Sequence, residues 1–244
     1  EAADPSQKVV IEIDGPCTER ARKVIVDSGI LEIKTVDEMM RSKWWPLFKA
    51  AMEEEIAGKL ANGAFKVVPR PARTNVMKSR WVVQVRLNDD GSIKKLKMRL
   101  VGCGYSQIPG EDFDKVYAST PPAFTLRYWL STCADEGLWT DHIDATKAFT
   151  QADVDRVLYC EMADGFTVPG HVYQLVKALE GIKQGAYLWF QKNRWAWGKC
   201  GLKSKATEPN LYTHETLQVI MAVFADDCGA GYEPSIRKEY LALR

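Results

Sequence analysis

The stretch from Val219 to Tyr232 constrains the fold more than any other part of this chain, because an apolar run is followed at once by two carboxylates. The run from Val219 to Phe224 contains β-branched residues and no charge, which predicts a buried strand. Asp226 and Asp227, with Gly229 close behind, predict a tight turn at its tip. A carboxylate pair at a strand tip suits a hard divalent cation such as Mg²⁺. Ordinary hairpin-turn chemistry explains the same residues, so this stretch alone leaves both interpretations open.

A third acid, Asp144, ends a second predicted strand that begins at Trp139 and leads through a turn into a helix. If the two strands are neighbours in one sheet, the carboxylate of Asp144 faces that of Asp226. The alternative role of Asp144 is a helix N-cap, which is common for Asp. The sequence therefore predicts a paired-acid site only on condition that the strands are neighbours.

A β-hairpin is predicted between residues 81 and 100, with its turn at residues 88–91. Alternating apolar residues define one face of it: Trp81, Val83, Val85, Leu87, Leu96, Met98 and Leu100. The opposite face carries Lys95, Lys97 and Arg99. Three cations in a row can hold a polyphosphate by charge and, for Arg99, by bidentate hydrogen bonds. A solvated sheet face that carries Lys for solubility is the alternative.

Charge is unevenly distributed along the chain, although the formal net charge is only +1. Residues 66–99 contain ten basic and two acidic residues. A second patch without acids contains Lys192, Arg194, Lys199, Lys203 and Lys205. Local positive fields of this kind favour phosphate-bearing partners over a merely solvated surface.

Several function classes lose support from the composition. With 46% hydrophobic residues the chain can bury a core, but no run approaches the roughly 18 apolar residues of a membrane span. The amino-terminal segment carries acids where a signal peptide carries bases, so secretion and a membrane partner are not expected. Six scattered cysteines and three isolated histidines match neither a zinc site nor a disulfide framework, and they favour free thiols.

Three helices and one further strand are also predicted. The first helix starts near residue 42, stops at Asn62-Gly63 and has apolar residues at every fourth position: Phe48, Met52, Ile56 and Leu60. The second has Thr120 as N-cap and stops near Gly137. The third follows Gly185, and its tryptophans are expected in the core rather than stacked on bases: Trp189, Trp195 and Trp197. The strand spans residues 157–162, and residues 1–37 show no interpretable motif.

Six groups of short motifs follow one another along the chain: Trp44-Trp45 with residues 51–55, residues 81–83 with 90–93, Lys97 to Gln107, Asp144 to Phe149 with residues 158–166, Gly181 to Gln184, and Phe224 to Asp227. In this order and spacing they resemble the reverse transcriptase of copia-type LTR retrotransposons. The resemblance covers about residues 39–240. Each motif alone is weak, whereas six in register are specific.

The resemblance implies an α+β fold of the right-hand polymerase type, with fingers and a palm whose antiparallel sheet is backed by helices. It implies RNA-directed DNA synthesis on an RNA or DNA template with a primer, from dNTP, with two Mg²⁺ ions and Mn²⁺ as an alternative. Asp144 and Asp226 would be the main metal ligands and catalytic acids, with Asp227 completing the triad. The nucleotide-binding residues would be Lys97 and Arg99 for the triphosphate, Phe149 as the steric gate against a ribose 2′-hydroxyl, and Gln184 beside the incoming nucleotide and template.

The chain departs from the family pattern in three places. Phe224 and Glu180 each stand where the family has Tyr, and Ala186-Tyr187 stands where it has Pro-Arg. We expect residues 1–38 to be an extension of unknown role and residues 39–244 to be fingers and palm, without the thumb and RNase H, as a fragment of a Pol polyprotein. Low or no processive synthesis is expected from this piece alone.

Two other functions compete with the polymerase. One is a catalytically inactive, truncated remnant that only binds nucleic acid. The other is a palm-fold nucleotide cyclase, which needs the same acids but explains neither the basic hairpin nor Gln184. Family habit implies a cytoplasmic location, in virus-like particles, or a nuclear one. The oligomeric state is not defined by the sequence.

Overall fold

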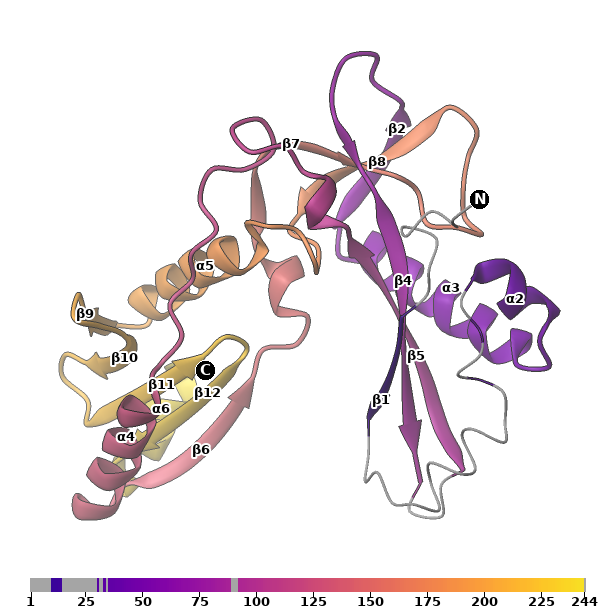
Figure 1. Cartoon of the computed structure of the whole chain (residues 1–244). Helices are drawn as coiled ribbons and strands as arrows, with labels where there is room; N and C mark the ends of the chain where they lie inside the picture. Colours follow the sequence, from indigo (N-terminus) through magenta and orange to yellow (C-terminus); the bar gives the residue numbers. More distant parts are fainter. Residues whose placement is uncertain (1–9, 15–29, 31–32, 34, 89–91, 244) are drawn as a thin grey trace. The chain divides into compact units, whose positions relative to one another are not determined.

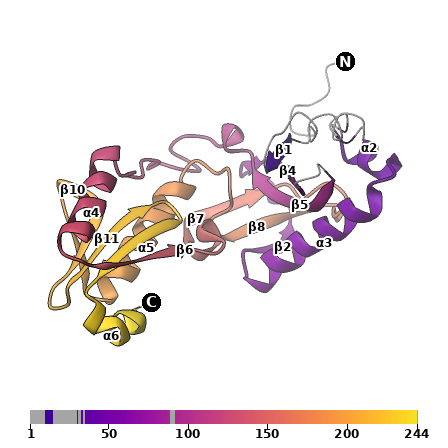
Figure 2. The same ribbon diagram turned by 90° about the horizontal axis from the view of Figure 1, so that it is seen from below.

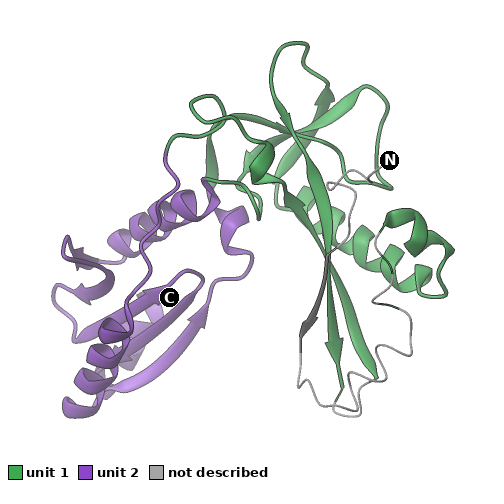
Figure 3. Cartoon of the chain, in the orientation of Figure 1, with its two compact units in different colours: residues 1–114, 153–183 green, residues 115–152, 184–244 purple. Residues whose placement is uncertain are grey.

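The computed structural model describes residues 10–14, 30, 33, 35–88 and 92–243. The chain divides into two compact units, residues 1–114 with 153–183 and residues 115–152 with 184–244 (Figure 3). The described residues form three sheets combined with helices, so the architecture is mixed α and β.

The predicted hairpin is the centre of the first unit. Its strands β4 (Ser79–Leu87) and β5 (Ile93–Gly102) pair antiparallel as a long ribbon (Figure 1). The seven apolar residues predicted for one face are all at most 7% exposed, so the predicted pattern is confirmed. The predicted turn residues 89–91 lie outside the described part of the chain. β1 (Val10–Asp14), from the predicted extension, pairs parallel with β4 and gives the order β1-β4-β5.

A second sheet completes this unit, with the strand order β2-β8-β7-β3. Its strands are β2 (Phe65–Pro69), β3 (Val76–Met77), β7 (Asp153–Cys160) and β8 (His171–Lys177). The strand predicted at 157–162 is β7, which starts four residues earlier and ends at Cys160. A 3₁₀ turn, η3 (Gly104–Ser106), follows β5.

Helix α3 (Trp45–Ala61) confirms the first predicted helix, and it follows the short α2 (Val36–Arg41). Phe48, Met52 and Ile56 are buried, but Leu60 is 48% exposed, so its predicted place in the core is wrong. The reason is geometric: each step of four residues overshoots one helical turn by about 40°, so the fourth apolar residue has rotated out of the buried face. Lys59 occupies the buried position instead, at 4% exposure.

The buried Lys59 connects three segments of the first unit. Its Nζ lies 2.8 Å from Oε2 of Glu180 and 3.2 Å from Oε1 of Glu55. Glu55 also accepts a hydrogen bond from the backbone N–H of Leu100 in β5, and the carbonyl of Glu180 accepts one from the N–H of Gly102. Glu180, which stands where the family that the sequence resembles has Tyr, is therefore the partner of a buried cation.

We expect Lys59→Ala to lower the free energy of unfolding of the first unit by about 3 kcal/mol, because it leaves two partly buried carboxylates without their cation. Urea denaturation followed by circular dichroism measures the change. The matched control is Lys49→Ala on the same helix, since the Lys49–Glu53 pair has side chains that are 57% exposed and should contribute less than about 1 kcal/mol. Equal effects of the two substitutions would contradict the role assigned to Lys59.

The second unit is built on one five-stranded antiparallel sheet with the order β6-β12-β11-β10-β9. Its strands are β6 (Trp139–Asp144), β9 (Leu202–Lys205), β10 (Glu208–His214), β11 (Val219–Phe224) and β12 (Asp227–Tyr232). β11 is the apolar run predicted as a buried strand, and its first five residues are buried, as predicted.

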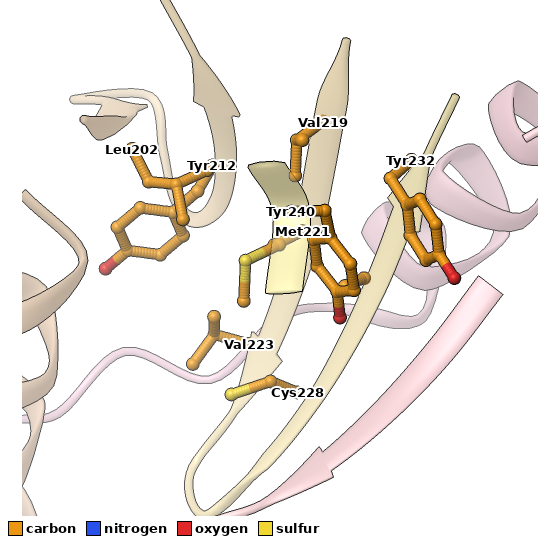
Figure 4. Packing of buried hydrophobic residues seen from close by; sticks show 9 residues of the cluster. Leu202, Tyr212, Val219, Met221, Val223, Cys228, Tyr232 and Tyr240 are labelled. Carbon is orange, nitrogen blue, oxygen red and sulfur yellow. The ribbon is translucent and has the colours of Figure 1, made fainter. Parts of the chain in front are cut away.

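One face of this sheet carries the main core of the unit. Met221, Val223, Cys228 and Tyr232 point into a buried cluster with Tyr240 of α6 (Arg237–Leu243), whose ring stacks on Tyr232 at 4.0 Å between centroids (Figure 4). Helix α5 (Gly185–Lys199) packs on the same cluster through the half-buried Trp197. A 3₁₀ turn, η5 (Pro234–Ile236), links β12 to α6.

The other face is covered by helix α4 (Ala123–Asp135), which lies against β10, β11 and β12 (Figure 2). The helix comes so close that a Cβ on Gly229 would lie 2.7 Å from the ring of Trp129, and one on Gly231 would lie 2.4 Å from Sγ of Cys133. Glycine at alternate positions of β12 therefore permits this packing. The remaining turn of the unit is η4 (Ala148–Gln151).

Two predictions for the helices of this unit are wrong. The N-cap of α4 is Pro122 rather than Thr120, and the cap makes no side-chain hydrogen bond. Trp195 is 58% exposed, because it lies on the solvent side of α5, where Lys192 and Lys199 pack over its ring. Trp189 is buried, as predicted. No helix in the described ranges is long and apolar enough to cross a membrane.

Candidate active site

The two strands β11 and β12 are joined by a two-residue turn that carries the acid pair. The turn residues are Ala225 and Asp226, and Asp227 is the first residue of β12. Ala225 has a φ of +53°, whereas Asp226 does not have a positive φ. A positive φ at only the first turn residue is typical of a type II′ hairpin turn, where glycine is favoured. An L-residue in this conformation stores about 1–2 kcal/mol of strain.

Two hydrogen bonds hold this turn in place. The indole Nε1 of Trp189 in α5 donates to the carbonyl of Ala225 at 2.8 Å. The backbone N–H of Ala145 donates to the carbonyl of Asp226 at 2.9 Å. The turn is therefore fixed both by the helix that packs on the core face and by the chain that leaves β6.

Asp144 lies directly opposite Asp227, because β6 pairs with β12 in the register Asp227↔Asp144. Directly opposed residues point to the same face of the sheet, with Cβ atoms about 4.5–5.5 Å apart. All three acids, Asp144, Asp226 and Asp227, are exposed. The N-cap of η4 is Lys147, so Asp144 does not have the alternative N-cap role.

His142 belongs to the same group of side chains. It lies two residues before Asp144 on β6, and its Nε2 is 3.0 Å from Oδ1 of Asp227. Both side chains are largely exposed, at 69% and 56%. His142 is isolated from other histidines and cysteines in the sequence, but the two-residue period of a strand places it on the face of Asp144.

The donor chemistry fits a hard divalent cation, because carboxylate oxygens are the preferred ligands of Mg²⁺. Asp144 and Asp227 could share such an ion from adjacent strands, and the adjacent Asp226 lies at the turn. Within the described ranges, however, no group of three or more His, Cys, Asp or Glu side chains is arranged to hold a metal. A complete three-acid site therefore requires at least one carboxylate to rotate.

Cys228 lies directly behind the acid pair, on the opposite face of β12. Burial raises the pKa of its thiol to about 12, with a further contribution from the carboxylates of Asp227 and Asp226. The thiol is therefore protonated at neutral pH and does not compete with the carboxylates as a ligand.

The remaining predicted site residues are distributed over both units. In the second unit, Phe149 is half-buried in η4, which packs against α5, and Gln184 is the fully buried N-cap of α5. In the first unit, Lys97 is exposed and Arg99 is half-buried on the polar face of β5, as the hairpin pattern predicts. Gln184 needs to become exposed before it can contact a nucleotide.

We expect Trp189→Phe to lower the free energy of unfolding of the second unit by about 1–2 kcal/mol, because the substitution removes the hydrogen bond to the strained turn. Chemical denaturation followed by circular dichroism tests this. Trp195→Phe on the same helix is the control, and its effect should stay within about 0.5 kcal/mol because the side chain is exposed. If the two variants are equally stable, the turn does not depend on Trp189.

Comparison with known proteins identifies the class of this chain. The family described as reverse transcriptase (RNA-dependent DNA polymerase) matches residues 62–231. The chain belongs to this family, as the sequence motifs predict.

Its relatives are Pol polyproteins of plant transposons. The chain is 32% identical over 145 residues to the retrovirus-related Pol polyprotein from transposon TNT 1-94 of Nicotiana tabacum, a match of 58% of this chain and 11% of the relative. It is 27% identical over 202 residues to the corresponding polyprotein from transposon RE1 of Arabidopsis thaliana, a match of 80% of this chain and 14% of the relative. The chain thus spans only a small part of these polyproteins.

A solved structure of a foamy viral protease-reverse transcriptase in complex with double-stranded DNA is also similar. The TM-score is 0.40 with 10% sequence identity, over 80% of this chain and 28% of the viral chain.

Proposed function

We propose that this chain supplies the fingers and palm of an RNA-directed DNA polymerase encoded by a retrotransposon. The first unit would be the fingers, with the basic hairpin β4–β5, and the second would be the palm, with its antiparallel sheet and covering helices. The observation that carries the proposal is the register that brings Asp144 beside Asp227, from separate family motifs, at exposed strand ends.

Asp144, Asp226 and Asp227 would hold two Mg²⁺ ions, or Mn²⁺, at the tip of this sheet. When bound, such ions lower the pKa of a primer 3′-hydroxyl and stabilise the charge that develops on the phosphates. The acids need no His base for this chemistry. The strained turn would keep Asp226 and Asp227 at the end of a rigid hairpin, because its carbonyls are held by Trp189 and Ala145.

The other site residues would bind the nucleotide. Lys97 and Arg99 would hold the triphosphate of a dNTP by charge and hydrogen bonds. Phe149 would exclude a ribose 2′-hydroxyl by its bulk, and Gln184 would contact the nucleotide once exposed. The remaining partner would be an RNA or DNA template with its primer, in cytoplasmic virus-like particles or in the nucleus.

Asp144→Asn and Asp226→Asn should each lower Mg²⁺-dependent nucleotide incorporation at least about 100-fold, because each removes a carboxylate charge from the metal site. Single-nucleotide extension of a labelled primer on an RNA template measures this. Asp135→Asn, at an exposed acid in α4 of the same unit, is the control and should retain activity. Full activity in either site variant would exclude the proposed mechanism.

The competing function is an inactive remnant that only binds nucleic acid. It is favoured by the lack of a converged three-acid group among the described residues. Template-primer binding without any incorporation by the unmodified chain, and with equal binding by Asp226→Asn, would support the remnant. Incorporation that depends on Asp226 would exclude it.

Arg99→Ala and Lys97→Ala should each raise the KM for dNTP about 10-fold or more, because a charge-assisted hydrogen bond to phosphate contributes roughly 1.5–3 kcal/mol. Steady-state incorporation kinetics at fixed primer-template provide the measurement. Lys66→Ala is the matched control, since Lys66 is exposed on β2, which belongs to the other sheet of the first unit. An unchanged KM for dNTP in both Arg99→Ala and Lys97→Ala would show that these two residues do not bind the triphosphate.

A further inference from the structure

A groove on the second unit lies apart from the acid turn. It is a cavity of about 450 Å³ between α4 and the strands β9, β10 and β11. Its aromatic wall is formed by Phe124 and Tyr128 of α4, its floor includes Leu211 of β10, and its rim carries Lys203 and Lys205 of β9. Glu208 at the start of β10 closes one side.

The strand register explains why these residues share one face. Thr213 of β10 lies opposite Lys203 of β9 and opposite Ile220 of β11, and all three line the groove. The intervening residues, such as Tyr212 and Leu202, point into the core on the other face. Side chains alternate along each strand, so the groove residues lie on the face covered by α4.

The aromatic wall is unusual for a helix surface because it faces solvent. Phe124 is 75% exposed and Tyr128 is 49% exposed. Their rings are nearly parallel, with centroids 6.5 Å apart and an interplanar angle of 23°. The exposed side of this stacked pair forms an aromatic ledge beside the groove, and the flat face of a ring suits a planar ligand.

The carboxylate of Glu208 can accept a further hydrogen bond. Its Oε2 accepts a hydrogen bond from Oγ1 of Thr125 at 2.7 Å. Its Oε1 is buried and has no hydrogen-bond partner among the described residues. An unsatisfied buried carboxylate oxygen is costly, so a ligand N–H that bonds to it, after the side chain turns this oxygen toward the groove, gains binding energy.

The rim of the groove is cationic. Lys203 and Lys205 are exposed on β9, and Lys203 also contacts the exposed Glu215. Two acids lie close to these lysines: Glu208 lines the groove, and Glu215 pairs with Lys203. A ligand that satisfies the whole groove must combine a flat apolar body, an N–H donor and an anionic group.

We propose that this groove binds an unpaired nucleotide of a single-stranded nucleic acid. The base lies on the Phe124–Tyr128 ledge, one of its N–H groups donates to Glu208, and its phosphates contact Lys203 and Lys205. An apolar peptide would use the ledge but would add no hydrogen bond to Glu208 and no ion pair to Lys205. The proposal rests on the proposed function only in taking nucleic acid as the partner, since the groove is separate from the acid turn.

The test is the binding of a fluorescein-labelled oligo(dC) of eight nucleotides, followed by fluorescence anisotropy in EDTA, so that no metal-dependent site contributes. Phe124→Ala should weaken binding about 10-fold, because stacking of one base contributes roughly 1–3 kcal/mol. Phe124→Tyr should retain binding, and Lys205→Ala should reduce the slope of log K against log salt concentration by about 0.7. Phe124 is largely exposed, so its truncation leaves the core intact.

The matched control is Trp195→Ala, since Trp195 is an exposed aromatic flanked by lysines on α5, outside the groove. Equal weakening by Trp195→Ala and Phe124→Ala, unchanged binding in Phe124→Ala, or no binding of the oligonucleotide by the unmodified chain would each overturn the proposal. Unchanged oligonucleotide binding by Phe124→Ala would indicate that the aromatic ledge contacts a protein partner instead. Phe124-dependent binding by a chain without polymerase activity would support the groove and refute the proposed function.

Discussion

The antiparallel pairing of β12 with both β11 and β6 is the interaction on which the second unit depends. It places Asp227 opposite Asp144 and joins the acid turn to the core. A shift of one residue in this register would move every side chain of a strand to the other face. Such a shift would move Cys228 and Tyr232 out of the core in which they are buried, and it would separate the acids. Burial of one face of β12 thus fixes the position of the acids on the other.

The alternation in β12 also explains its composition. Cys228, Ala230 and Tyr232 fill the core shared with α5 and α6, whereas Gly229 and Gly231 face α4. Small residues on that face let α4 approach closely, and this brings its aromatic residues to the edge of the sheet. Strain at Ala225 is tolerated because the turn is held by Trp189 from the core side. A single short strand therefore positions the acids, the helix and the core.

Local patterns in the sequence predict the strands and most helices, because alternation and four-residue spacing are read from neighbouring residues. The hairpin faces, the strand at 219–224 and the end of α3 at Asn62-Gly63 follow from such patterns. The pairing of β6 with β12 and the buried Lys59–Glu180 pair do not, because each joins residues far apart in the chain. Leu60 and Trp195 show the limit of the local approach, since hydrophobicity alone does not say which side of a helix meets the core.

The acids and the groove occupy the same face of one sheet, near opposite ends of its central strands. Asp227 pairs with Phe224 at the turn, and Ile220, which lines the groove, pairs with Gly231. Phe224 lies four steps along the strand from Ile220, a distance of about 13 Å. A change that loosens β11 and β12 should therefore disturb both sites together. A change confined to an exposed ring on α4 should act on the groove alone, because that ring does not contribute to the strand register that positions the acids.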